Sequence, residues 1–229
     1  MIPRPTSLPH PSLRSLPSLP HPPLPRPGTR AHQREVTRLA LIDATIEVLV
    51  KEGYGALTTR RIAERAGVAQ STLMHHFETR EALLIEAIPR IAAQLATDAL
   101  EQIDLEALRR PEHREAVLDQ AWREFTSAQA LAAAALWAAA WSEPELAVTL
   151  REVEQRLSTI IVGTARTLVP ELAGDERVGA LIDSAVSLIR GLVMAIPVSG
   201  LDEVEARWER IKPLILQATK ELLDRPAAT

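Results

Sequence analysis

Cysteine is absent from all 229 residues, which excludes disulfides, thiolate metal sites and cysteine nucleophiles. Aromatic residues make up only 3% of the chain, although its apolar fraction is 46%. The core must therefore be built from Leu, Ala, Ile and Val, a composition that favours helices. The lack of cysteine also fits the interior of a cell, so we expect a cytoplasmic protein.

Two further patterns are missing. No apolar run approaches the roughly 20 residues needed to cross a bilayer, and prolines interrupt the N-terminal segment where a signal peptide would lie. The apolar–polar alternation typical of β-strands is also absent over any useful length, as are internal repeats. We therefore predict an all-α protein without a membrane segment.

The net charge of −4 is unevenly distributed along the chain. Residues 1–90 contain 12 Lys and Arg against 8 Asp and Glu, whereas residues 91–229 contain 14 against 22. A polyanion should therefore meet only the first third of the chain.

The N-terminal segment is rich in proline, with ten of the seventeen prolines in residues 1–28. Proline prevents helix and sheet hydrogen bonding, so residues 1–32 are predicted to form a disordered arm that favours polyproline II. The arm is basic, because it contains four arginines up to Arg30 and the first acidic residue of the chain is Glu35. It is either a dispensable tail or a source of additional phosphate contacts.

A long helix is predicted after the arm. Leu41, Thr45 and Leu49 share one stripe at helical spacing, with Ala44 and Val48 beside it. Gly53 is placed to end this helix.

Two short helices are predicted around Gly67. Thr58 is a good N-cap for the helix that Gly67 ends, and Gly67 supplies the positive φ of a tight corner. Val68 and Leu73 would fill the angle between the two helices, as in a helix-turn-helix. Each helix is too short to be stable alone, so both must pack on the long helix before them.

The second short helix carries a polar face with almost no charge, formed by Gln70, Ser71, Thr72, His75 and His76. Amide, hydroxyl and imidazole groups match the donors and acceptors of base edges in the DNA major groove. A metal site on the two histidines is disfavoured, because adjacent helical residues point about 100 degrees apart and no Cys or close carboxylate joins them.

Residues 38–88 resemble the DNA-binding domain of the TetR family of transcriptional regulators. The matching residues are Gly53, Tyr54, Thr58, Ile62, Ala63, Ala66, Gly67, Val68, Thr72, Leu73, His76, Phe77, Arg80 and Glu81. The resemblance implies a homodimer with a three-helix helix-turn-helix DNA-binding domain in each subunit. It also implies a larger helical effector domain whose last two helices pair across a two-fold axis. Residues 136–146 are similar to a segment of the family's ligand-binding domains.

Carried over residue by residue, the resemblance places these side chains at double-stranded operator DNA: Thr58, Arg60, Arg61, Gln70, Ser71, Thr72, His75, His76 and Arg80. Gln70 is expected to pair with an adenine edge, and Arg60 and Thr72 are expected to hold phosphates. Thr58 would cap a helix whose amides face the DNA backbone, and Arg80, usually Lys in the family, would reach another phosphate.

The chain departs from the family at two positions. Met74 replaces a tyrosine that contacts phosphate, and Ala69 replaces a Ser or Thr whose cap is worth about 1 kcal/mol. Binding should therefore depend more heavily on Arg60, Arg61, Arg80 and the basic arm.

The rear of the chain is also predicted to be helical. Thr79 should cap a helix that contains Pro89, and the Ala-rich residues 128–141 should form a central helix. Pro197 and Gly200 should break the penultimate helix near Ile196, and Asp202 should cap the last one.

Four of the seven aromatic residues lie within twenty positions, namely Trp122, Phe125, Trp137 and Trp141. Trp137 and Trp141 are one turn apart on the predicted apolar helix. These residues either fill the core or line a pocket for a small, largely apolar effector.

Two apolar stripes run along the last two predicted helices. They consist of Leu181, Ala185, Leu188 and Leu192, and of Val204, Trp208, Ile211 and Ile215. Either an intramolecular core or a dimer interface would produce them, and the resemblance favours a four-helix dimer contact.

We therefore predict a DNA-binding domain at residues 33–80 and a ligand-binding and dimerisation domain at residues 81–229. The expected function is a repressor released from a palindromic operator by an unidentified small molecule. A DNA-binding dimeric scaffold with a protein partner is the alternative. An enzyme is disfavoured, because no catalytic constellation, phosphate loop or cofactor site is present in the sequence.

Overall fold

The structure is a computed structural model that describes residues 28–168 and 174–223. Residues 1–27, most of the predicted arm, lie outside the described residues. The first helix begins at Arg30, inside the segment predicted as arm.

The described residues form helices joined by short connections. The α-helices are α1 (Arg30–Glu52), α2 (Thr59–Ala66), α3 (Gln70–His76), α4 (Arg80–Gln102), α5 (Arg114–Phe125), α6 (Ala128–Ala139), α7 (Pro144–Leu168), α8 (Glu176–Ser199) and α9 (Leu201–Leu223). Short 3₁₀ helices are η1 (Tyr54–Ala56), η2 (Leu105–Arg109) and η3 (Pro111–His113). No strand occurs among these residues, which confirms the all-α prediction.

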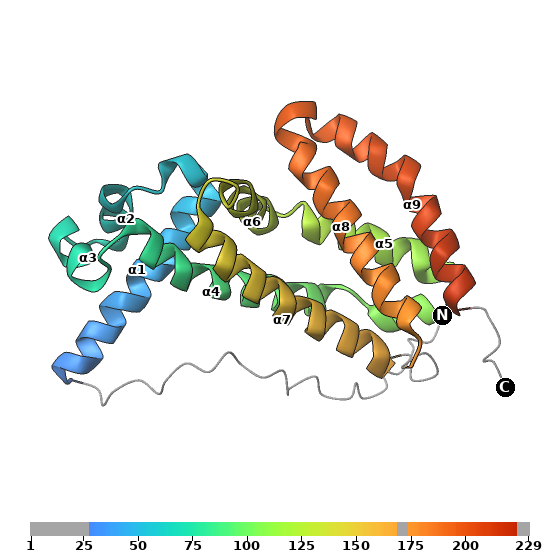
Figure 1. Cartoon of the computed structure of the whole chain (residues 1–229), viewed down its shortest axis with the longest axis horizontal. Helices are drawn as coiled ribbons and strands as arrows, with labels where there is room; N and C mark the ends of the chain where they lie inside the picture. Colours follow the sequence, from blue (N-terminus) through green and yellow to red (C-terminus); the bar gives the residue numbers. More distant parts are fainter. Residues whose placement is uncertain (1–27, 169–173, 224–229) are drawn as a thin grey trace, which may run out of the picture.

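The helices form an elongated molecule (Figure 1). At one end α1, α2 and α3 form a unit that we call the head, and α8 and α9 pack on each other at the other end. The long helices α4 and α7 pack side by side between the two ends.

α1 supports the head through the predicted apolar face. Its buried residues are Leu41, Ile42, Ala44, Thr45, Val48 and Leu49. The Thr45 hydroxyl donates to the Leu41 carbonyl oxygen at 2.8 Å, so the polar group on this face is satisfied. Gly53 ends α1 with φ 84, a conformation that favours glycine.

Two predictions about helix ends are wrong. α8 does not end near Ile196 but continues through Pro197 to Ser199, and of the two predicted breakers only Gly200, with φ 81, ends it. α9 begins at Leu201, so Asp202 lies within its first turn and is not its cap. There the carboxylate still faces the positive end of the helix dipole.

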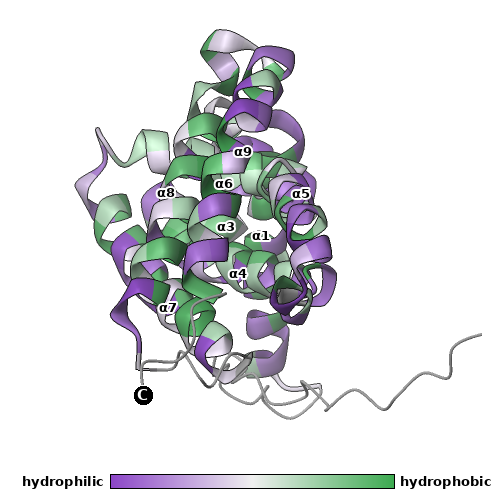
Figure 2. Cartoon of the chain, turned by 90° about the vertical axis from the view of Figure 1, so that its right-hand side faces the viewer, coloured by the Kyte–Doolittle hydropathy of each residue, from purple (hydrophilic) through white to green (hydrophobic). Residues whose placement is uncertain are grey.

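The apolar side chains of the described residues gather in two cores. The first joins α1–α4 to Leu136 of α6 and to Leu146 and Leu150 of α7. The second joins α5 to α8 and α9. Figure 2 shows hydrophobic and hydrophilic residues alternating along most of the labelled helices, as amphipathic packing requires. The head therefore shares its core with α6 and α7, across the predicted boundary at residue 80.

α8 is more apolar than its burial explains. Over an 18-residue window its mean hydropathy is 1.7, yet only 11% of that window is buried. By length and composition alone, α8 is long and apolar enough to cross a membrane. The prediction that no segment has this length and composition is therefore wrong. The same properties also fit a helix whose outer face meets another protein chain.

Candidate nucleic-acid interface

α2 and the corner after it have the predicted construction. Thr58 Oγ1 accepts a hydrogen bond from the Arg61 amide at 3.2 Å, which caps α2. Gly67 ends α2 in the left-handed conformation, with φ 68. The Val68 amide donates to the Ala63 carbonyl oxygen at 3.0 Å, and this bond helps fix the direction in which the chain enters α3.

α3 has only seven residues and is held from its inner side. Leu73 is fully buried, and Phe77, just after the helix, is also buried in the first core. Ala69 occupies the N-cap position and makes no side-chain hydrogen bond, as predicted for a residue without a side-chain acceptor. Since so short a helix is not stable alone, the position of α3 depends on these apolar contacts.

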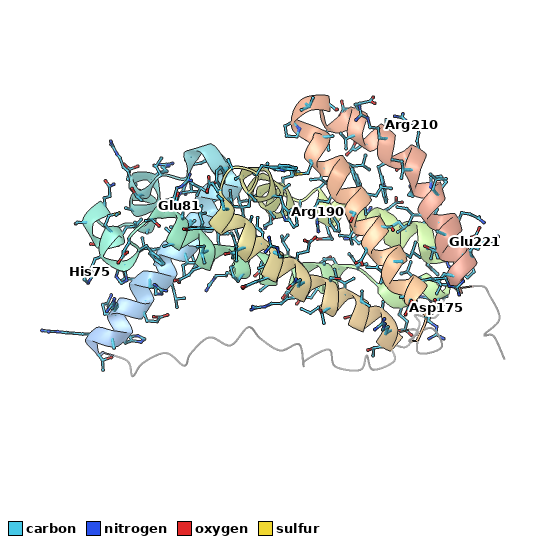
Figure 3. All side chains as sticks on the ribbon, in the orientation of Figure 1. His75, Glu81, Asp175, Arg190, Arg210 and Glu221 are labelled. Carbon is cyan, nitrogen blue, oxygen red and sulfur yellow. The ribbon has the colours of Figure 1, made fainter. Side chains whose placement is uncertain are left out.

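The outer face of α3 carries the polar groups. Gln70, Ser71 and His75 are exposed, whereas Thr72 and His76 are half-buried. Gln70 Nε2 donates to Thr59 Oγ1 at 2.9 Å, so the amide also contacts the start of α2. Figure 3 shows His75 at the head end of the molecule, far from Arg210 and Glu221 on α9. This face has the donors and acceptors that base edges require.

His76 is turned partly inward. Its Nδ1 atom is buried and has no hydrogen-bond partner among the described residues. Burial lowers the pKa of His76 below its ordinary value of 6.5, and the positive charge of Arg34 lowers it further. The neutral imidazole is therefore favoured, which makes His76 a weaker candidate for phosphate binding than His75.

Arg34 is a candidate that the sequence prediction missed. It lies on α1, is exposed, and its charge acts on His76 at the end of α3. The sequence assigned α1 only a supporting role. The available signal was the spacing of Arg30, Arg34 and Arg38, which places basic side chains on adjoining turns of one helix.

The arginines of α2 differ in their availability to DNA. The Arg60 side chain is 81% exposed and pairs with Glu64 of the same helix at 3.0 Å. Arg61 Nε lies 2.7 Å from Glu52 Oε2, and Arg65 Nη2 lies 2.9 Å from Glu52 Oε1. These two guanidinium groups lower the pKa of Glu52 to about 2. Arg61 thus ties α2 to the end of α1, and a phosphate would compete with this ion pair.

Arg80, predicted to reach a phosphate, is held by carboxylates. Its Nη2 lies 3.0 Å from Oε1 of Glu143, which directly precedes α7, and its Nε lies 2.9 Å from Glu81 Oε1. Its guanidinium carbon also lies 5.3 Å from the centre of the Tyr54 ring. In this arrangement two carboxylates share the Arg80 charge.

The head corresponds to a known family of DNA-binding domains. The family described as "Bacterial regulatory proteins, tetR family" matches residues 41–87. The HTH-type transcriptional regulator BetI of Rhizobium meliloti is 32% identical over 162 residues, which cover 69% of this chain and 76% of the relative. BetI of Escherichia coli K12 is 30% identical over 180 residues, with coverage of 76% and 89%.

The chain belongs to the TetR family. The match confirms the resemblance at residues 38–88 and identifies a DNA-binding transcriptional regulator; the relatives are regulators, not enzymes. A TetR transcription regulator from Haloarcula marismortui shares the fold with a TM-score of 0.57 at 16% identity, over 83% of this chain and 97% of that one.

The aromatic residues of this TetR-family chain lie in separate places. Trp122 is 7% exposed and stacks on Trp208, with ring centroids 5.1 Å apart. Phe125 packs against the same second core. Trp137 packs against the first core, and the Arg190 guanidinium carbon lies 4.2 Å from the centre of its ring. Core packing, one of the two interpretations from the sequence, accounts for these contacts.

Trp141 does not share a helix with Trp137, so that prediction is wrong. α6 ends at Ala139, and Trp141 follows in a turn with 92% of its surface exposed. A hollow of about 290 Å³ between α5 and α9 is lined by Asp119, Trp122, Arg123, Glu205, Trp208 and Glu209. Of the four residues predicted to line a pocket, Trp122 lines this hollow.

The two predicted dimer stripes contain buried and half-buried residues, and the half-buried Ala185, Leu188 and Ile211 also pack against the second core. Leu192, Val204, Trp208 and Ile215 are buried within one protomer, in the second core. Leu181, Ala185, Leu188 and Ile211 are half-buried. The buried four are therefore core residues of the TetR-family protomer, and the apolar pattern alone did not distinguish core from interface.

Proposed function

We propose that the protein is a dimeric repressor that a small molecule releases from a palindromic operator. The observation that carries the DNA-binding part is the outer face of α3, where Gln70, Ser71 and His75 are exposed on a helix anchored by Leu73 and Phe77. As a regulator of transcription it would act in the cytoplasm.

In this proposal the contacts to DNA come from three elements. Gln70 pairs with an adenine edge, and Ser71 and His75 contact neighbouring groups in the major groove. Arg60 of α2 and Arg34 of α1 hold phosphates on the two sides of α3.

The dimer contact is formed by the outer face of α8 and the adjoining face of α9. The exposed small residues Ala180, Ser184, Ser187 and Gly191 line α8, and Val198 near its end is 90% exposed. Leu214 of α9 is 69% exposed. A second copy packed on these helices by a two-fold axis would cover the apolar surface of α8.

Ligand response is proposed for the α5–α9 side of the rear domain, where the Trp122–Trp208 stack borders a hollow. A second candidate function, a DNA-binding dimer whose rear domain binds a protein, is favoured by the exposed Trp141. Addition of candidate small molecules to the DNA complex separates the two, since only the first function predicts release.

Footprinting of the purified protein on the DNA around its own gene tests the proposal. We expect protection of two symmetric half-sites separated by about one duplex turn or more. Absence of protection at low salt would refute the proposed function.

A further inference from the structure

A three-residue network links the head to the turn before α7. Tyr54 Oη donates to Glu143 Oε1 at 2.5 Å, and Arg80 Nη2 donates to the same oxygen at 3.0 Å. Burial and the adjacent Glu143 carboxylate raise the pKa of Tyr54 to about 12, so the phenol keeps its proton and remains a donor. The residues come from η1, the first turn of α4, and the α6–α7 turn.

The Glu143 carboxylate is held through one oxygen only. Oε1 receives both hydrogen bonds, whereas Oε2 is buried and has no partner among the described residues. A buried carboxylate oxygen without a hydrogen-bond partner raises the free energy of the closed arrangement. Less free energy is therefore needed to separate Glu143 from Arg80. The network is therefore closed but incompletely satisfied.

The closed network removes positive charge from the head. Arg80 begins α4, four residues after His76 ends α3, so it lies close to the proposed DNA-reading face. Glu81 and Glu143 both lie within 3.0 Å of its guanidinium, so Arg80 and these two carboxylates together carry one net negative charge. Such a group repels a phosphate, although Arg80 alone would attract one.

We propose that Glu143 is an internal competitor of DNA for Arg80, so that the α6–α7 turn sets how strongly the head binds phosphate. This inference rests on the proposed DNA-binding function and adds its regulation. DNA binding is weakened while Glu143 pairs with Arg80. When Glu143 moves away, Arg80 gains a phosphate contact.

The rear domain is connected to this switch through the first core. Leu136 of α6 and Leu146 of α7 lie on either side of Glu143 in sequence, and both are buried against the head. A relative shift of α6 and α7 would therefore change the distance between Glu143 and Arg80. Figure 3 shows Glu81, the neighbour of Arg80, where α4 starts at the head.

The test is the binding of the full-length Glu143→Gln variant to a mixed-sequence DNA duplex at several salt concentrations. Glutamine retains an acceptor for Tyr54 but removes the charge that holds Arg80. We expect tighter binding and a steeper salt dependence. Each added phosphate contact corresponds to an extra loss of about 3.5-fold in affinity between about 50 and 200 mM salt, or about 12-fold for the two heads of a dimer.

Two further variants isolate the contact. Glu145→Gln removes the same charge two residues away, at an exposed position in the first turn of α7, and should change binding much less. In an Arg80→Ala background, Glu143→Gln should give no gain. Circular dichroism melting curves verify that each variant is folded.

The outcomes separate this inference from the function on which it rests. Equal effects of Glu143→Gln and Glu145→Gln, or a gain that persists without Arg80, would overturn the competition while wild-type DNA binding stands. A wild-type protein that binds no duplex overturns the proposed function, and the competition is overturned with it.

Discussion

The arginines of the head differ chiefly in the carboxylates with which they are already paired. Arg60 pairs within its own helix and its side chain is 81% exposed, whereas Arg61 is held by Glu52 at the end of α1. An exposed pair contributes little and is readily exchanged for a phosphate. Arg61 must give up a contact between two helices to make the same exchange.

This difference predicts unequal effects of two arginine substitutions. Arg60→Ala should lower the slope of log affinity against log salt by about one per head, because a phosphate contact is lost. Arg61→Ala should change the slope less and the melting temperature more. Fluorescence anisotropy on a duplex over a salt series measures the slope, and equal slopes for the two variants would contradict the assignment.

His76 gives a prediction about pH. Burial and nearby Arg34 hold the pKa of His76 below 6.5 in the folded protein. The unfolded chain therefore binds a proton at higher pH than the folded chain, so acidification below about pH 6.5 favours unfolding. Between about pH 7 and pH 5, the melting temperature should fall less in His76→Gln than in the wild type. An equal fall would show that His76 does not titrate as described.

At the scale of elements, α3 is the least self-sufficient helix of the head. Its N-cap Ala69 has φ −67 and ψ 147, which are suitable for a capping residue, but supplies no acceptor. Ala69→Ser should therefore raise the free energy of unfolding by about 1 kcal/mol. Urea denaturation measures the change, and Thr58→Ala, which removes the existing cap of α2, should lower it by a similar amount. A Ser variant no more stable than wild type would contradict the capping argument.

Local signals in the sequence predicted the elements of the head well. Thr58, Gly67 and Thr79 act through neighbouring backbone groups, so their sequence context was sufficient to assign their roles. The end of α6 was not predictable in this way. The Ala-rich segment has no cap or breaker between Ala139 and Trp141, yet α6 ends at Ala139 with Ala140 as its C-cap.

Partners distant in the sequence were not predictable. Arg80 and Glu143 are 63 residues apart, and nothing in the motif around Arg80 indicates that a carboxylate from the rear domain lies beside it. The same limit applies to Val204 and Trp208, which have the spacing of an interface stripe but fill a core. Apolar periodicity indicates that a face is covered, without indicating which surface covers it.

For the whole molecule, the two cores divide the helices into two packed units. The head shares a core with α6 and the start of α7, whereas α5 packs with α8 and α9. In the proposed ligand response, a change at the α5–α9 side would reach the head through the helices that join the two cores. Such a change in both subunits of a dimer would alter the spacing of the two heads on DNA.

The proposed dimer predicts the effect of a charge on α8. Gly191 is exposed, and a Cβ added there meets nothing within 4 Å in the protomer. Gly191→Glu should therefore leave the protomer folded but favour the monomer, which multi-angle light scattering measures. Gly163→Glu on α7, also exposed and uncrowded, is the matched control and should not change the mass. A wild-type monomer at micromolar concentration would contradict the dimer.

The most direct test of the account is the ratio of affinities for footprinted operator DNA and for a mixed-sequence duplex, measured for the wild type and for Gln70→Ala. We predict that Gln70→Ala reduces the difference in binding free energy between the two duplexes by about 1–3 kcal/mol per half-site. The affinity for the mixed-sequence duplex should be nearly unchanged. An unchanged ratio, or an equal loss on both duplexes, would contradict the claim that the outer face of α3 recognises the base sequence.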